Sequence, residues 1–464
     1  MGKSANFMTN LVHHRIRRGI KVVFLGKVFS VLGVLLLSGV LARALPSKDM
    51  GVFFLTSSLV SFMAIVCQLG LNQSVVRNIA QAIARERYDI ARSVAYTSFL
   101  YGIAAVLVCA LFLGSGVLNV IWGMLLSERS HAPLSLLIFA WIGLTTIQSL
   151  LGEVFRGLHA IGSATLFGVQ SGTSGTLSLA LGLLILLIFM VMGRTLTLDL
   201  ALASLVFGQL VCVCAAALAL TRHFHPLSHE KRPTNRLNFS LSVPVSLMLT
   251  GILFFVVGQI DLWVLGFLRT EEEVAIYGAA STLVKYVSSV NLLLSAVIPS
   301  SVAELYAKEQ KQELENMLRA TALLSTLFAL GMALLFWVFG GQILSAIFGA
   351  SYAVAAPVLA ILAIGHIVNA LTGNCGILLI MAGKDRVILT VTLISGVVTT
   401  LLVLVLIKYY GLLGVAIGSA LGLAGMNVFM WLSARHYLKI WTHAKFSGAD
   451  LKLWLGRTLS NKAE

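Results

Sequence analysis

Apolar runs separated by short polar breaks recur along the whole chain. Each run is about 20 residues long, the length that an α-helix needs to cross roughly 30 Å of hydrocarbon. The runs predict twelve membrane-spanning helices, which are numbered here in chain order as spans 1 to 12: 20–42, 50–71, 93–119, 133–153, 164–193, 197–221, 241–267, 274–299, 319–343, 354–382, 387–407 and 411–433. The least polar break, "FGASYAVAAP", contains Gly and Pro, which favour a turn. The pattern predicts an all-α integral membrane protein.

The composition supports this fold class. Hydrophobic residues make up 58% of the 464 residues and charged residues only 11%, whereas about a quarter of a soluble protein is charged. The first apolar run leads directly into further spans, so we expect no removable signal peptide. The five cysteines all lie in apolar runs and are expected to be small buried hydrophobic residues rather than metal ligands. The composition leaves no room for a large soluble domain.

The net charge of +15 could suggest a nucleic-acid partner, but the positions of the charges favour another explanation. If the chain crosses the membrane at each predicted span, 25 of the 33 Lys and Arg residues fall on one side and six on the other. Cytoplasmic segments are enriched in Lys and Arg. The asymmetry therefore predicts that both termini are cytoplasmic, and we expect no nucleic-acid partner.

Two pairs of segments match at one shift of 224 residues. "LARALPSKDMGVFF", from Leu41, aligns with "LGFLRTEEEVAIYG", from Leu265, and "APLSLLIFA", from Ala132, aligns with "APVLAILAI", from Ala356. Each half then has six spans, and an even number makes the repeat a parallel one. The sequence predicts two six-helix lobes around a central cavity, a layout typical of alternating access.

The repeat also predicts how the chain is divided. We expect an N-lobe at 1–221, a basic cytoplasmic linker at 222–240, a C-lobe at 241–433 and an amphipathic cytoplasmic tail at 434–464. The tail mixes Trp and Leu with Lys, which favours a position along the inner membrane surface. The segment "SVVRNIAQAIARERYDIAR", at 74–92, is interpreted as a similar amphipathic helix.

Ionisable residues inside predicted spans are candidates for function. Asp261 lies about 10 Å from the outer end of span 7, and Lys285 lies about 16 Å from the same side in span 8. Two interpretations remain open: a structural ion pair between these residues, or a wet cavity in which both contact a substrate or a coupling ion. Lys27 in span 1 either extends to the cytoplasmic interface or lines the cavity.

Other polar residues also leave two interpretations. Glu153 and Arg156 lie one turn apart at the inner end of span 4, which favours a local ion pair. His366, Asn369 and Asn374 in span 10 either bind a sugar or join helices by hydrogen bonds.

Motifs for catalysis or ATP binding are absent from the sequence: there is no phosphate-binding glycine loop, no H-E-x-x-H and no nucleophile elbow. We therefore expect a transporter rather than an enzyme, with no cofactor. Its energy would come from an ion gradient, with H+ or Na+ as candidate coupling ions, from the membrane potential, or from the substrate's own gradient.

Several stretches together resemble the MOP flippase superfamily of multidrug, oligosaccharidyl-lipid and polysaccharide exporters, specifically its polysaccharide-transporter branch. The stretches are "LARALPSKDMGVFFL", "NQSVVRNIA" with Arg77, "DLWVLGFLRTEEEVAIYGAASTL", "IPSSVAELY", "IFGASYAVAAPVLAIL" and "YGLLGVAIGSALG". They occur in order over nearly the whole chain. The family's aspartate after the span-7 glycine matches Asp261, and its tyrosine–alanine step matches Tyr277 and Ala279–Ala280.

The resemblance implies a lipid-linked oligosaccharide as substrate, in bacteria a polyprenyl pyrophosphate that carries a sugar repeat unit. Such a flippase sits in the bacterial inner membrane and moves its substrate from the cytoplasmic to the periplasmic leaflet. The implied partners are membrane lipids, a polysaccharide polymerase and other assembly proteins. The residues proposed for the substrate pathway or ion coupling are Asp261, Lys285, Lys27, Arg77, Glu153, Arg156 and Asn374.

Two other functions were weighed against a flippase. A cation-coupled drug or metabolite antiporter would need buried carboxylates in the first lobe, but Glu153 lies at the inner edge of its span. A membrane-embedded glycan polymerase or ligase would normally show a large external loop, whereas the predicted outer loops are short. A pyrophosphate is anionic, and Lys27 and Lys285 would attract it. The sequence therefore favours the flippase.

Overall fold

The computed structural model describes residues 25–112, 132–171, 174–193, 195–224, 245–294 and 298–445. These ranges are almost entirely helical and belong to two compact units, Met1–Ile252 and Leu253–Glu464. Within them, nine helices are long and apolar enough to cross a membrane. The predicted all-α membrane fold is confirmed. The count of twelve and the lobe limits stay predictions, because several spans are broken and most of the linker at 222–240 lies outside the described residues.

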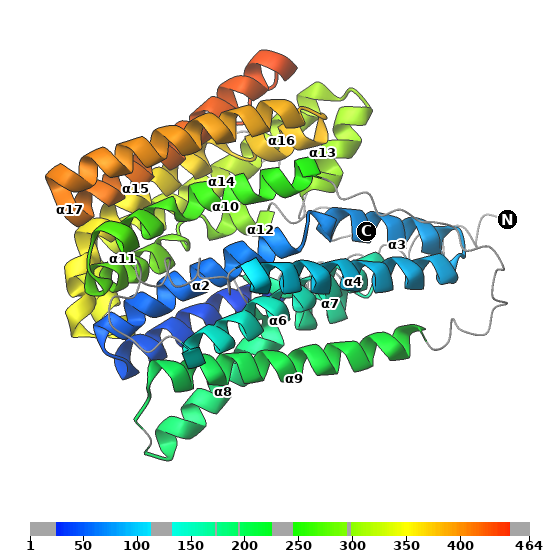
Figure 1. Cartoon of the computed structure of the whole chain (residues 1–464). Coiled ribbons are helices and arrows are strands. Elements are labelled where there is room, and N and C mark those ends of the chain that lie inside the picture. The colour runs from blue at the N-terminus through cyan, green and yellow to red at the C-terminus, as the bar shows by residue number, and fades with distance from the viewer. Residues whose placement is uncertain are drawn as a thin grey trace, which may run out of the picture. The chain divides into compact units, whose positions relative to one another are not determined.

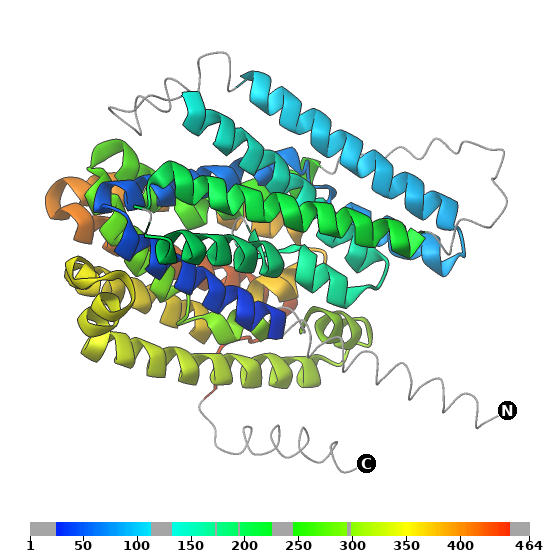
Figure 2. The same cartoon turned by 90° about the horizontal axis from the view of Figure 1, so that it is seen from below.

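The first unit contains a chain of helices interrupted by one small sheet (Figure 1). Its described elements are Leu25–Ala44, α2 (Ser47–Cys67), α3 (Leu71–Ala84), α4 (Tyr88–Phe112), α6 (Ala132–Gly157), α7 (Ile161–Phe167), β1 (Val169–Ser171), β2 (Ser174–Gly175), α8 (Thr176–Val191) and α9 (Leu198–Phe224). Helices α8 and α9 pack side by side (Figures 1 and 2).

Span 5 is not the single helix that its hydrophobicity predicts. The antiparallel strands β1 and β2 separate α7 from α8. A Cβ on Gly168 would lie 2.9 Å from the Cα of Gly152 in α6, so the chain passes α6 at a distance that only glycine allows. The prediction was wrong because hydropathy does not register the Gly and Ser residues of "GVQSGTSG", which break the helix.

The segment 74–92 is helical but does not form a separate helix on the membrane surface. It contributes to α3 and α4, which are separated by a turn in which Glu86 has a φ of 56°. The apolar face of α3, including Val75 and Ile79, is buried in a core shared with α4 and α6. The amphipathic pattern was correct, but its apolar face is covered by protein.

The second unit begins within α10 (Val245–Leu268). The elements that follow are α11 (Glu271–Val284), α12 (Ser289–Leu294), α13 (Ile298–Ala307), α14 (Lys311–Phe348), η3 (Ala350–Ala355), α15 (Ala356–Thr372), α16 (Cys375–Met381) and α17 (Asp385–Leu438). The break predicted between spans 9 and 10 is confirmed, because α14 ends before Gly349, which has a φ of 114°.

Helix α17 contains 54 residues and folds back on itself. A straight helix of this length would be about 80 Å long, more than twice the thickness of the hydrocarbon layer. The helical geometry breaks at Gly411, which has a φ of 55°. A Cβ on Gly418 would lie 2.9 Å from the Val403 side chain, and a Cβ on Gly422 would contact Thr399. Glycines therefore allow the two halves, which correspond to spans 11 and 12, to pack closely and antiparallel.

The internal repeat is visible in the element boundaries. Helices α2 and α11 begin 224 residues apart, and so do α6 and α15. The turns that follow share a left-handed residue at the same shift: His159 has a φ of 56° and Gly383 a φ of 69°. The two halves of the chain therefore repeat the same order of helices and turns.

The predicted tail at 434–464 differs from its expected structure. Helix α17 continues to Leu438, and the described residues after it pack against the second unit instead of lying free for the membrane surface. Thr442 has no exposed surface. Residues 446–464 lie outside the described residues.

Candidate functional site

Asp261, on α10, is surrounded by hydrogen-bond donors within the second unit. The Tyr277 hydroxyl of α11 donates to its Oδ2 at 2.5 Å, and the Ser419 hydroxyl of α17 donates to the same oxygen at 3.0 Å. The Leu262 backbone N–H donates to Oδ1 at 2.8 Å. A carboxylate inside a membrane protein is costly unless it is hydrogen-bonded or paired. Three donors from three elements and the backbone provide this compensation.

Lys285 follows directly after the last residue of α11, where predicted span 8 is interrupted. The chain turns there with short-range bonds, from Tyr286 N–H to Leu283 O at 3.0 Å and from Val287 N–H to Val284 O at 2.9 Å. Helix α12 begins only at Ser289. Span 8 was predicted as one helix, and that prediction was wrong. Non-helical backbone at membrane depth is tolerated only where protein surrounds it or where it lines a water-filled cavity.

The Lys285 side chain is exposed, although its residue lies at a helix break between apolar segments. Among the ion pairs of the described residues, none joins it to Asp261. The carboxylate is still near enough to stabilise the ammonium electrostatically. The hydrogen bonds of Asp261 therefore go to hydroxyls and backbone, and the ammonium remains available to a ligand.

His366, on α15, connects the helix break to the rest of the second unit. Its Nδ1 lies 2.8 Å from the Ser288 hydroxyl, which belongs to the break itself. His366 is also near enough to Lys285 for the two groups to interact electrostatically. The break therefore has a fixed position beside α15 and presents one cation, one imidazole and one hydroxyl.

The first unit brings together three of the sequence candidates. Arg156 Nη1 lies 2.7 Å from Glu153 Oε1, so the expected local ion pair is present. Lys27, on the helix Leu25–Ala44, is half-buried and close enough to Arg156 for the two cations to repel each other. This arrangement places two cations beside one carboxylate.

Two candidates lie apart from these clusters. Arg77 is exposed on α3, and no hydrogen bond or ion pair described for the chain joins it to Lys27 or Arg156. Asn374 is 7% exposed at the break between α15 and α16, and its buried Nδ2 has no hydrogen-bond partner among the described residues. Its burial favours a structural role over direct contact with a sugar.

The sequence identified Asp261 and Lys285, but it did not identify the hydrogen-bond partners of Asp261. Tyr277 was noted only through a family motif, and Ser419 was one small residue in "YGLLGVAIGSALG". Tyr277 and Ser419 lie 16 and 158 residues from Asp261. No local spacing links such positions. In the described residues, no group of three or more His, Cys, Asp or Glu side chains is placed to hold a metal ion.

Comparison with known families extends over most of the chain. Residues 16–305, well over half of the sequence, match the family described as "Polysaccharide biosynthesis protein". Residues 246–406 match the MatE family. A probable low-salt glycan biosynthesis flippase of Haloferax volcanii, Agl15, is 25% identical over 195 residues. That match covers 41% of this chain and 40% of the relative, less than half the length of either protein.

Solved structures resemble the whole fold. An inward-facing multidrug resistance MATE family transporter of the MOP superfamily matches with a TM-score of 0.67 and 15% identity, over 89% of this chain and 94% of its own. The Vibrio cholerae MATE transporter VcmN gives 0.65 and 16%, over 93% and 98%. A MOP superfamily transporter from Pyrococcus furiosus, described as having a binding pocket of reverse polarity, gives 0.55 and 16%, over 92% and 95%.

At these identities, the solved structures establish the fold alone. The family match and the fold agree with each other, and both families consist of transporters or flippases rather than enzymes. The chain therefore belongs to the polysaccharide biosynthesis protein family and is a transporter of the MOP superfamily.

Proposed function

We propose that the protein is a flippase that moves a polyprenyl-pyrophosphate-linked oligosaccharide from the cytoplasmic to the periplasmic leaflet by alternating access. The observation that carries this proposal is Lys285, an exposed ammonium at a break in a membrane helix, without an ion pair among the described residues. Broken membrane helices commonly form the binding sites of transporters. A free cation at such a break suits an anionic substrate.

Electrostatics in the first unit support an anionic substrate as well. Lys27 and Arg156 share a single nearby carboxylate, that of Glu153, so one positive charge is left uncompensated. A pyrophosphate carries negative charge that such a site would attract strongly away from bulk water. We propose that this cluster contributes to the substrate pathway, together with Arg77 on the basic side of the unit.

We propose that Asp261 acts with H+ or Na+ as the coupling ion. Its carboxylate accepts bonds from two hydroxyls, Tyr277 and Ser419, which are oxygen donors that could rearrange around a cation or a proton. The position 224 residues earlier is Leu37, so the first unit has no equivalent acid. We also propose an inner-membrane location with cytoplasmic termini and a polysaccharide polymerase as a partner.

A second candidate is a cation-coupled drug or metabolite antiporter. It is favoured by the match to the MatE family over residues 246–406 and by the MATE structures that share the fold. Against it stand the exposed ammonium of Lys285 and the excess of cations around Arg156, since a site for cationic compounds would need the opposite charge.

Deleting the gene is expected to cause a lipid-linked oligosaccharide to accumulate in the cells. Blocked translocation leaves the loaded carrier on the cytoplasmic leaflet, so extracted lipids should contain more polyprenyl-pyrophosphate sugar than those of the parent strain. Lipid extraction followed by mass spectrometry measures this amount. Unchanged lipids together with retention of cationic dyes would favour the antiporter instead.

A further inference from the structure

The carbonyl groups at the break in span 10 receive hydrogen bonds from the chain that follows α17. A helix end leaves several backbone carbonyls without helical partners. Here, Ala444 N–H donates to Leu371 O at 2.9 Å, and the Thr442 hydroxyl donates to Thr372 O at 2.7 Å. Residues near the C-terminus thus satisfy two carbonyls at the end of α15.

Gly373 makes this close approach possible. It has a φ of 70°, and a Cβ at this position would lie 2.6 Å from Thr442 O and 2.8 Å from the Ala322 side chain. In the first half of the chain, the corresponding helix α6 runs without a break through position 149. The break and the segment packed on it therefore belong to the second unit alone.

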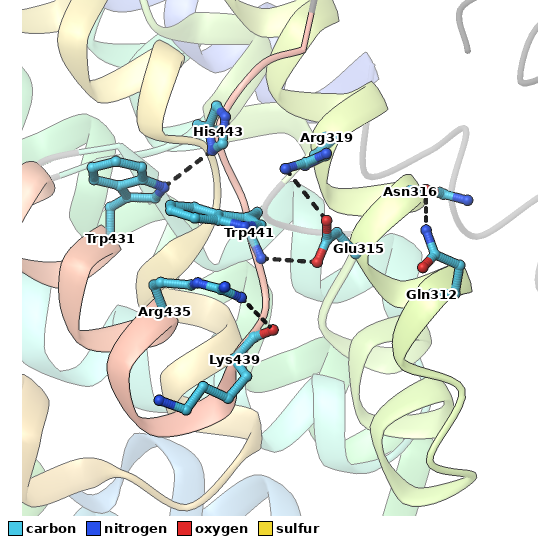
Figure 3. Close-up of polar contacts among 9 residues, drawn as sticks. All are labelled: Gln312, Glu315, Asn316, Arg319, Trp431, Arg435, Lys439, Trp441 and His443. Carbon is cyan, nitrogen blue, oxygen red and sulfur yellow. Dashed lines mark hydrogen bonds and ion pairs between the residues drawn. The ribbon is translucent and has the colours of Figure 1, made fainter.

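Side chains from α14 and α17 hold the same segment (Figure 3). Glu315 accepts the Trp441 backbone N–H at 3.1 Å. The Arg435 guanidinium lies 4.4 Å from the centre of the Trp441 ring. The Trp431 indole N–H donates to His443 Nδ1 at 3.3 Å. Backbone, charge and aromatic contacts thus act on one short stretch.

The segment is also part of the apolar core. Ile440 is 1% exposed and belongs to the same cluster as Cys375, the first residue of α16, which is equally buried. Removing the segment would open this core directly at the break.

We propose that residues 439–445 form a C-terminal clamp that replaces the hydrogen bonds interrupted in span 10 and closes the inner end of the second unit over the break. The clamp joins α14, α15 and α17 and keeps α16 in place. It is independent of the identity of the transported substrate.

The clamp is expected to loosen in acid. Burial, and after it the Arg319 guanidinium, lower the pKa of His443 below its ordinary value, while Glu315 acts in the opposite direction. The other charged groups around the clamp are Arg435 on α17 and Lys445 at its end. Neutral His443 accepts the Trp431 N–H, and protonated His443 cannot.

Because the folded state disfavours the proton, the stability of the clamp is complete at neutral pH and falls as the pH drops below about 6.5. The rate at which a thiol reagent labels Cys375, divided by the rate for the buried Cys212, should therefore rise between about pH 7.5 and about pH 5.5. In His443→Gln this rise should be much smaller. An equal rise in the variant would contradict a role for His443.

The decisive experiment compares two truncations of the purified chain by the same labelling. A chain that ends after Lys445 keeps the clamp, and its Cys375 should react as slowly as in the full chain. A chain that ends after Leu438 lacks the clamp, and its Cys375 should react at least about tenfold faster, because local opening becomes easier. Cys212, which is fully buried in the first unit, is the internal control and should not change.

Point variants separate the clamp from a general loss of folding. Thr442→Val removes only the hydroxyl that donates to Thr372 and should give an intermediate increase at Cys375. The matched variant Thr390→Val changes a threonine whose hydroxyl bonds within an exposed helical turn, and it should give none. Unchanged Cys375 labelling after truncation at Leu438, or an equal increase at Cys212, would overturn the proposal.

Discussion

Replacing Lys285 with alanine is expected to lower glycan export at least about tenfold while the protein remains in the membrane. A charge-assisted contact to an anionic group contributes about 1.5–3 kcal/mol, and each 1.4 kcal/mol corresponds to about a factor of ten. The side chain is exposed and forms no ion pair among the described residues, so its removal leaves no buried carboxylate without its salt bridge. The measurement is export of the surface glycan at matched amounts of membrane protein.

Two further variants sharpen the Lys285 prediction. Lys285→Arg keeps the positive charge and should retain much of the export. Lys408→Ala removes an exposed lysine of α17 outside the site and should leave export unchanged. Normal export by Lys285→Ala at normal expression would rule out a role for this ammonium in binding.

Replacing Asp261 with asparagine is expected to lower the free energy of unfolding by about 1.5–3 kcal/mol. The two carboxylate oxygens accept bonds on both sides, from the Tyr277 and Ser419 hydroxyls on Oδ2 and from the Leu262 N–H on Oδ1. An amide has only one oxygen, so its NH2 group must face a donor in either orientation. Reversible unfolding in mixed micelles measures the change.

The charge swap decides which partner Asp261 has. If hydroxyls are its partners, Asp261→Lys combined with Lys285→Asp should not restore stability, whereas Tyr277→Phe alone should reproduce part of the loss. Glu273→Gln, which breaks an exposed 3.8 Å pair with Arg269, is the control and should change stability by less than about 1 kcal/mol. Full restoration by the swap would show a direct ion pair.

Much of the fold was predictable because hydrophobic length and charge asymmetry are properties of the whole chain. The repeat was also predictable: the shift that aligned Ala132 with Ala356 recurs in the starts of α6 and α15. The breaks were not. Spans 5, 8 and 10 are apolar throughout, and each is interrupted where tertiary contacts, such as those of the clamp at Gly373, replace helical hydrogen bonds.

The candidate site shows the same division. An acid and a lysine inside apolar runs stand out in a sequence, so Asp261 and Lys285 were found. Their relation was not, because two rises along separate helices give similar depths without giving the direction of either side chain. The structure directs the acid toward Tyr277 and Ser419, and this leaves the lysine exposed.

Reconstituted transport tests the central claim most directly, that this chain moves an anionic lipid-linked oligosaccharide with the help of Lys285. Purified protein is placed in liposomes that carry polyprenyl-pyrophosphate oligosaccharide in one leaflet, and its arrival in the other leaflet is followed. The account predicts transfer by the unmodified protein, about a tenth or less by Lys285→Ala, and little transfer of a neutral polyprenyl glycoside. Equal transfer of the neutral lipid, or transport of cationic dyes alone, would contradict it.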